Sequence, residues 1–162
     1  MGALLNPNAT DMDGSVNELE IAARSLRVEL RVLKGGTERQ IDEAFAGLMQ
    51  QRLDALYVAN DPFLSGQSDR IISHAARLGL PTINGGRGFA AAGGLISYGP
   101  SIPDAYHQAG VYVARILKCE KPSDLPVVQS VKLDLVINLK TAKALGVAIP
   151  PGVFAIADEI IE

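Results

Sequence analysis

Short apolar segments alternate with amphipathic segments along much of the chain, and this alternation limits the possible fold more than any other feature. Residues 55–59, Ala-Leu-Tyr-Val-Ala, are continuously apolar, which is typical of a strand covered on both faces. Residues 3–5 and 80–84 predict further short strands, and apolar residues recur at helical spacing between them. Strands that alternate with helices at this interval predict βαβ units. We therefore expect an α/β fold, a three-layer sandwich with a mainly parallel sheet flanked by helices.

The predicted helices begin at sequences that can satisfy free backbone amides. Ser15–Glu18 and Thr37–Gln40 fit the capping box, in which a hydroxyl and a Glu or Gln three residues later each accept a hydrogen bond from a backbone amide. Asp61-Pro62 also fits a helix start, because aspartate is a favoured cap and proline is tolerated in the first turn. The glycine-rich residues 85–94 predict a loop. Residues 28–32 alternate apolar and charged side chains, which predicts a strand at the edge of the sheet.

Residues Gly93–Pro100 divide this regular alternation from a less regular remainder. Their apolar centre predicts a short strand, and the glycines and proline around it do not favour a helix. Pro150-Pro151 predicts the start of a last short helix, which we expect to end at Ile160-Ile161. We expect three parts along the chain: an α/β core at 1–99, a crossover helix and linker at 100–130, and a C-terminal strand with helices at 131–162.

The charge and cysteine content exclude several classes of partner and site. The 162 residues carry 15 basic and 18 acidic side chains, a net charge of -3, and these are scattered along the chain, so we expect no nucleic acid partner. Cys119 is the only cysteine, which excludes an internal disulfide and a cysteine-based metal site. No apolar run approaches the roughly 20 residues of a membrane span, and residues 1–5 lack the features of a secretory signal, so we expect no signal peptide in this chain.

Ligands of open α/β sheets bind outside the carboxyl ends of the strands, where loops meet. Three such loops begin at Asn6, Asn60 and Asn84. We expect Asp61 to receive a ligand ammonium group, asparagines to supply hydrogen bonds, and an aromatic side chain to form an apolar wall. The candidate ligand-binding residues are Asn6, Asn8, Asn60, Asp61, Phe63, Asn84 and Tyr98. Each asparagine could instead bond its own backbone in a turn, and Asp61 could be a helix cap only.

Other motifs carry no comparable signal for catalysis or cofactor binding. Gly86–Ala91 matches a dinucleotide-binding pattern, but it lies late in the alternation and Gly93-Gly94 follows it, so a loop is favoured. His74 and His107 have no second ligand at metal-binding spacing, and the serines lack the surroundings of a nucleophile elbow. We therefore expect no catalytic residues, no metal and no cofactor, and a protein that is not an enzyme.

The strongest signal is a resemblance that spans the whole chain. It is carried by residues 132–146, Lys-Leu-Asp-Leu-Val-Ile-Asn-Leu-Lys-Thr-Ala-Lys-Ala-Leu-Gly, and by separate blocks at Ile149–Pro151, Ala157–Ile161, Ala92–Pro100 and Leu5–Asn8. These blocks closely resemble a bacterial solute-binding family of ABC transporters. The resemblance implies one lobe of a two-lobed type I periplasmic binding protein, flavodoxin-like in architecture. Some members of that family are linked to amino acids.

From this resemblance we expect roughly the second half of a solute-binding protein, without the signal sequence and most of the first lobe. Such a fragment would recognise a small molecule, an amino acid or a similar solute, in a cleft between lobes. The family also implies a periplasmic location and an ABC permease as the partner of the intact parent. Two alternatives stay open: a small flavodoxin-like cofactor-binding or enzymatic domain, and a structural self-associating module.

The helix expected at Asp104–Lys118 would, by the same resemblance, pack on the first lobe. Its apolar stripe would then lack its usual cover in this chain. An exposed apolar stripe favours association, so we expect a homo-oligomer, a homodimer formed through this helix. Exchange of the segment between two copies is one way to form it.

Overall fold

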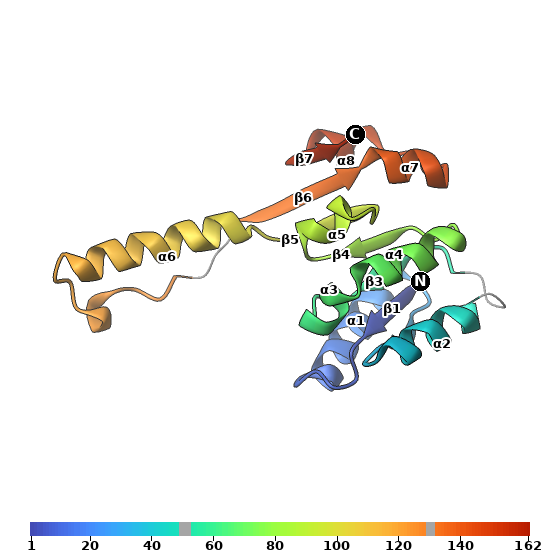
Figure 1. The fold of residues 1–162 in the computed structure, drawn as a ribbon, viewed down its shortest axis with the longest axis horizontal. Coiled ribbons are helices and arrows are strands. Elements are labelled where there is room, and N and C mark those ends of the chain that lie inside the picture. Colours follow the sequence, from blue (N-terminus) through green and yellow to red (C-terminus); the bar gives the residue numbers. More distant parts are fainter. Residues whose placement is uncertain (49–52, 129–131) are drawn as a thin grey trace.

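A computed structural model describes residues 1–48, 53–128 and 132–162 of the chain. These residues form one sheet of seven strands in the order β2-β1-β3-β4-β5-β6-β7 (Figure 1). The strands are β1 Gly2–Leu5, β2 Arg31–Lys34, β3 Leu56–Val58, β4 Thr82–Asn84, β5 Ile96–Pro100, β6 Leu133–Asn138 and β7 Glu159–Ile161. All neighbours are parallel except β5 and β6, so the predicted α/β fold with a mainly parallel sheet is confirmed. Strand β2 lies at the edge as predicted, although it begins at Arg31 rather than Val28.

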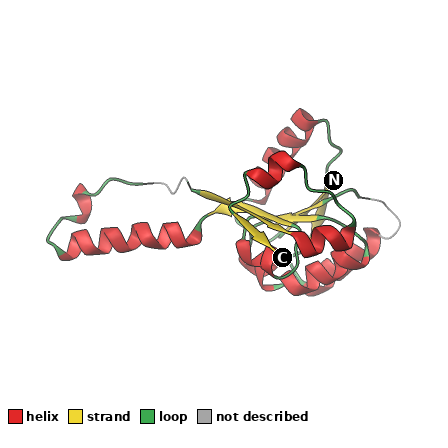
Figure 2. Ribbon diagram, turned by 90° about the horizontal axis from the view of Figure 1, so that it is seen from above, coloured by secondary structure: helices red, strands yellow, loops and turns green. Residues whose placement is uncertain are grey.

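Helices cover both faces of this sheet (Figure 2). The described helices are α1 Met12–Leu26, α2 Glu38–Leu48, α3 Pro62–Gly66, α4 Ser68–Arg77, α5 Arg87–Ala91, α6 Ile102–Leu117, α7 Leu139–Leu145 and α8 Pro151–Ala155, with a 3-10 helix at Pro122–Asp124. Helices α2, α4 and α5 pack on the face that carries Leu56 and Val58. Helix α1 lies on the opposite face, where its Leu19 and the alternate strand residues Leu5 and Tyr57 line one hollow.

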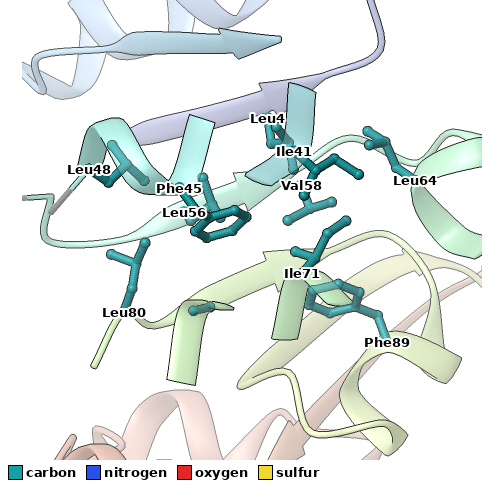
Figure 3. Packing of buried hydrophobic residues seen from close by; sticks show 11 residues of the cluster. Leu4, Ile41, Phe45, Leu48, Leu56, Val58, Leu64, Ile71, Leu80 and Phe89 are labelled. Carbon is teal, nitrogen blue, oxygen red and sulfur yellow. The ribbon is translucent and has the colours of Figure 1, made fainter. Parts of the chain in front are cut away.

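The hydrophobic core lies between the sheet and helices α2, α4 and α5 (Figure 3). Ile41 and Phe45 of α2, Ile71 of α4 and Phe89 of α5 are each less than 5% exposed. Burying a side chain of this size contributes roughly 1.5–3 kcal/mol. This packing holds β1, β3 and β4 together, so the loops that follow these strands are fixed relative to one another.

Helix α1 begins four residues earlier than its capping box predicts, since its cap is Asp11 rather than Ser15. Asp11 is the cap, because its side chain accepts a hydrogen bond from Gly14 N at 3.2 Å, while Ser15 Oγ donates to Asp11 O. The predicted start at Ser15 is therefore wrong, since an aspartate one turn earlier already satisfies the first turn. The capping box at Thr37–Gln40 is confirmed in its forward bond: Thr37 Oγ1 accepts from Gln40 N at 3.2 Å.

Two local predictions in the second half are wrong. Residues 85–94 are not entirely a loop, because they contain α5, whose Phe89 and Ala90 are buried against the sheet. The last helix, α8, ends at Ala155, and Glu159–Ile161 form strand β7 beside β6. In both places burial and strand pairing decide the structure over the local preference of the sequence.

Helix α6 extends away from the sheet, and none of its residues is buried (Figure 1). The chain leaves the sheet at β5 and returns at β6, and Ser101 N donates to Lys132 O at 3.0 Å where the two connections lie side by side. The helix predicted at Asp104–Lys118 is confirmed, with a start two residues earlier. The part boundary predicted at residues 130 and 131 lies outside the described residues.

An ionic network joins the outer surfaces of α2 and α4. Arg70 on α4 pairs with Glu38 at 2.6 Å and with Asp42 at 2.9 Å, and His74 Nε2 lies 2.8 Å from Asp42 Oδ1. The ring of His74 stacks on Phe45 with centroids 5.0 Å apart, which places the network directly over the core. Hydrogen bonds from His74 and Arg70 lower the pKa of the Asp42 carboxyl.

Replacing Asp42 with asparagine is expected to lower the thermal midpoint of unfolding at neutral pH and not at low pH. Because the folded-state pKa of Asp42 is depressed, its contribution is complete above the unfolded value of 3.8 and is lost as the pH falls through the folded value. Calorimetry between about pH 7 and pH 2.5 checks this, with Glu43→Gln, in an exposed pair with Arg39, as the control. A difference between Asp42→Asn and the parent that persists at the acid end would contradict the assignment.

Candidate functional site

The three loops that the sequence singled out meet at one edge of the sheet. Strands β1, β3 and β4 are parallel neighbours, so their carboxyl ends point the same way. The loops continue from Leu5, Val58 and Asn84, where these three strands end. Directly after β3, Ala59 N donates a hydrogen bond to Leu4 O of β1 at 3.0 Å. This edge is where open α/β sheets bind ligands.

Asn6 joins the first loop to the second. Its Nδ2 donates to Asp61 Oδ1 at 3.1 Å, and its Oδ1 accepts from Asn8 N at 3.0 Å. The second bond is the local turn that asparagine favours. Asn8 itself is exposed. It lies against Gly36 in the loop after β2, since a Cβ added to that glycine would be 2.7 Å from Asn8 Nδ2. Asn6 is therefore a turn residue that also orients the carboxylate of Asp61.

Asp61 caps α3 through one of its two carboxylate oxygens. Its Oδ1 accepts from Leu64 N at 3.1 Å in addition to the bond from Asn6. Within residues 1–48, 53–128 and 132–162, no hydrogen bond to Oδ2 is formed. The side chain is half-buried at the rim of the strand ends. A carboxylate held in this way can accept a charge-assisted hydrogen bond from a cationic ligand group.

Asn84 is buried, and its side chain serves the protein itself. Its Nδ2 donates to Val58 O at 2.9 Å, and its Oδ1 accepts from Gly86 N at 2.7 Å. These bonds tie the loop after β4 to strand β3. Asn60, in contrast, is exposed. It packs against Gly85, since a Cβ added to that glycine would lie 3.3 Å from Asn60 Cβ.

The two aromatic candidates lie apart from the bonded polar groups. Phe63 is half-buried and packs against the hydrophobic core. Tyr98 is 53% exposed. It is the residue after Ser97, which pairs with Asn84 in the register of β4 and β5. Successive strand residues point to opposite faces, so Tyr98 and Asn84 lie on different sides of the sheet. An apolar wall formed by either aromatic ring stays a prediction.

A hollow of about 380 Å³ on the α1 side contains residues that the sequence did not single out. Asn60 lines it together with Ser15 and Glu18 of α1 and Tyr57 of β3. Burial raises the pKa of the Tyr57 hydroxyl above its ordinary value, which keeps the phenol a neutral donor. Side chains alternate between the two faces along a strand, so the sequence could have placed Tyr57 on the face opposite to Leu56 and Val58.

A second hollow, of about 340 Å³, lies on the other side of the same edge. It is lined by Ser65, Ser68, Asn84, Gly86, Gly88 and Phe89. Its polar groups are hydroxyls and backbone amides rather than charges. The two hollows show that the strand ends offer hydrogen-bonding surfaces on both faces of the sheet.

Arg87 fixes the loop after β4 to the last strand. Its Nε donates to Glu159 Oε2 at 2.6 Å, and its second guanidinium bond reaches the other carboxylate oxygen. These hydrogen bonds lower the pKa of Glu159. Both charges are therefore engaged with each other, and the pair holds the loop that Asn84 joins to β3.

The arrangement is suited to binding through hydrogen bonds and one carboxylate. In the part of the chain that the structure describes, no three His, Cys, Asp or Glu side chains gather where they could hold a metal ion. None of the described helices combines the length and the apolar character that crossing a membrane requires.

Comparison with known proteins places the chain among transport proteins. A family described as "ABC transporter substrate binding protein" matches residues 1–161. A tyrosine-binding protein from Clostridioides difficile (strain R20291) is 25% identical over 146 residues, covering 90% of this chain and 42% of that protein. The chain thus spans less than half the length of this relative.

Solved structures share the fold and again extend beyond the chain. An ABC domain from Streptococcus pneumoniae in complex with L-Trp has a TM-score of 0.82 at 24% identity, over 99% of this chain and 55% of that one. A conserved domain protein from Vibrio cholerae has a TM-score of 0.81 at 24% identity, over 98% of this chain and 53% of that one. The chain therefore matches about half of each structure, one lobe of a substrate-binding protein.

Proposed function

Because the chain belongs to the ABC transporter substrate-binding protein family, whose members bind solutes and are not enzymes, we propose that its strand-end edge forms one wall of an amino-acid cleft. The observation that carries this proposal is Asp61. Its Oδ1 is fixed by Asn6 and Leu64, and among the described residues no group donates a hydrogen bond to its Oδ2. A pre-oriented carboxylate of this kind suits the ammonium group that all free amino acids share.

The other candidate residues act around this carboxylate in the proposal. Asn8 and Asn60 are exposed beside it and supply hydrogen bonds to the polar end of the ligand. Asn84 acts through the loop that it holds, by fixing Gly86 N. Phe63 and Tyr98 are the proposed aromatic contacts. We further propose an aromatic amino acid as the ligand, since the relatives above are a tyrosine-binding protein and a complex with L-Trp.

The chain supplies one side of the cleft in this proposal. A small ligand in an enclosed site has most of its surface buried, and one lobe can cover only part of it. We therefore propose that this chain alone binds weakly and that a second lobe closes over the ligand. In an intact parent, the loaded protein would act outside the cytoplasmic membrane, in the periplasm, and would deliver the solute to an ABC permease.

We also propose that the chain self-associates as a homodimer through the helix predicted at Asp104–Lys118. The support is that α6 is long, apolar and without a buried residue. This property is separate from ligand binding, so one can fail without the other.

Native mass spectrometry with a panel of amino acids, flavin and nucleotides tests the proposed class of ligand. We expect adducts with L-tyrosine and L-tryptophan, weaker adducts with aliphatic amino acids, and none with flavin or nucleotides. Adducts with flavin or a nucleotide alone would replace the proposal by a cofactor-binding function. The same spectra report the number of copies in the complex.

A further inference from the structure

A hollow of about 300 Å³ lies between α4 and α7, apart from the candidate ligand site. Ile72 and Ala76 of α4 line it, together with Ala144 and Leu145 of α7 and the core residue Leu80, which is labelled in Figure 3. Leu80 precedes β4, so the hollow lies at the amino-terminal end of this strand. The candidate ligand site lies at the carboxyl end. This cavity is called the α4–α7 hollow.

The hydroxyl groups that line the α4–α7 hollow are already engaged within the chain. Thr82 Oγ1 accepts a hydrogen bond from Leu95 N at 3.3 Å, and Thr141 Oγ1 donates to Gly93 O at 2.8 Å. A molecule in the hollow therefore meets mainly alkyl groups of the two helices and of Leu80. Burial of its apolar surface is the interaction that these groups offer.

Lys140 gives the α4–α7 hollow its charge. It is exposed in the first turn of α7, and no acidic side chain is among the described residues that line the hollow. A lysine can lay its alkyl stem along an apolar surface and keep its ammonium group in water. That group forms charge-assisted hydrogen bonds with carboxylates. The hollow thus combines an apolar interior with one cation at its rim.

We infer that the α4–α7 hollow binds a free aliphatic monocarboxylate, whose chain lies between the two helices and whose carboxylate pairs with Lys140. Its volume is at the lower end of the roughly 300–1,000 Å³ of small-molecule sites, so a chain of about six to ten carbons is favoured. A free amino acid is less suited, because its ammonium group would approach that of Lys140. The inference does not rest on the proposed function, since it uses other residues at the opposite edge of the sheet.

A titration of the ¹⁵N-labelled chain with sodium octanoate tests this site. We expect saturable amide shifts at Ala76, Gly93, Thr141 and Ala144 with a Kd of about 1 mM or lower, and none at Asp61. Octylammonium has the same chain with the opposite charge and is expected to bind at least about tenfold more weakly. Octylammonium that binds at these amides as tightly as octanoate would overturn the inference, because the hollow would then recognise apolar surface alone.

Two lysines of α7 provide a matched test of the charge. Lys140 lines the hollow, and Lys143 does not. Lys140→Gln is expected to weaken octanoate binding about threefold to fivefold, as for an exposed ion pair, and Lys143→Gln less than about 1.5-fold. Glutamine forms helices about as well as lysine, so both variants should keep α7. Equal octanoate affinities for Lys140→Gln and the parent chain would contradict the role of Lys140.

Filling the α4–α7 hollow tests where the alkyl chain lies. Ala144 is exposed, so Ala144→Leu adds bulk at the hollow without overpacking the core, and leucine is a good helix former. It is expected to weaken octanoate binding at least about tenfold while the thermal midpoint stays within about 2 °C of the parent. Binding that Ala144→Leu leaves unchanged would overturn the inference. So would the absence of saturable shifts at the lining amides up to about 5 mM octanoate.

Discussion

Replacing Gly99 with alanine is expected to destabilise the protein by about 3 kcal/mol and to lower its thermal midpoint by about 6–12 °C. A Cβ at this position would lie 2.1 Å from the carbonyl oxygen of Gly85 and 2.9 Å from its carbonyl carbon. Both contacts are with backbone, so no side chain can rotate away. The end of β5 must instead separate from the loop after β4.

Gly88→Ala is the matched control for this prediction. Gly88 lies in the neighbouring helix α5, and a Cβ there would meet nothing within 4 Å. Alanine at a helical position is expected to be neutral or to stabilise by about 0.5–1 kcal/mol. Thermal unfolding followed by circular dichroism measures both variants. Equal midpoints for Gly99→Ala and the parent would mean that the close approach to Gly85 is not required.

The sheet could be predicted from the sequence because its signals are local and redundant. The run at 55–59 marks a buried strand by composition alone, and Asp61-Pro62 marks the helix after it. Strand β7 could not be predicted in this way, since residues 159–161 become a strand only by pairing with β6. The start of α1 was missed for a different reason: Asp11 and Ser15 are both good caps, and sequence alone does not rank them.

The candidate site shows the same limit. That the loops after β1, β3 and β4 share an edge follows from a parallel sheet, so their meeting was predictable. The partner of each side chain was not. Asn84 turns inward to Val58, and Asn6 reaches across to Asp61, because distances between loops depend on packing that no local pattern encodes.

Replacing Asp61 with asparagine is expected to remove ligand binding while the fold stays intact. Asparagine is as good a helix cap as aspartate, and its side-chain oxygen can still accept from Leu64 N and Asn6 Nδ2. Only the negative charge is lost. Removing one partner of a charged hydrogen bond in a binding site costs about 2 kcal/mol or more, which is a loss of affinity of about 30-fold or more.

The ligand offers its own control. N-acetyl-L-tryptophan keeps the aromatic ring and the carboxylate of L-tryptophan and lacks the ammonium group. If Asp61 receives that group, the acetylated ligand should bind the parent chain as poorly as L-tryptophan binds Asp61→Asn. The thermal midpoint of Asp61→Asn should stay within about 1 °C of the parent, because the cap is kept.

A titration of the ¹⁵N-labelled chain with L-tryptophan and L-tyrosine, followed by amide chemical shifts, tests the proposed cleft wall most directly. The account predicts saturable shifts at the strand-end loops, at Asn8, Asp61, Leu64 and Gly86, and their loss in Asp61→Asn. Shifts confined to the apolar hollow between α4 and α7, lined by Ile72, Ala76 and Leu145, would contradict it. Strand-end shifts that Asp61→Asn leaves unchanged would contradict it as well.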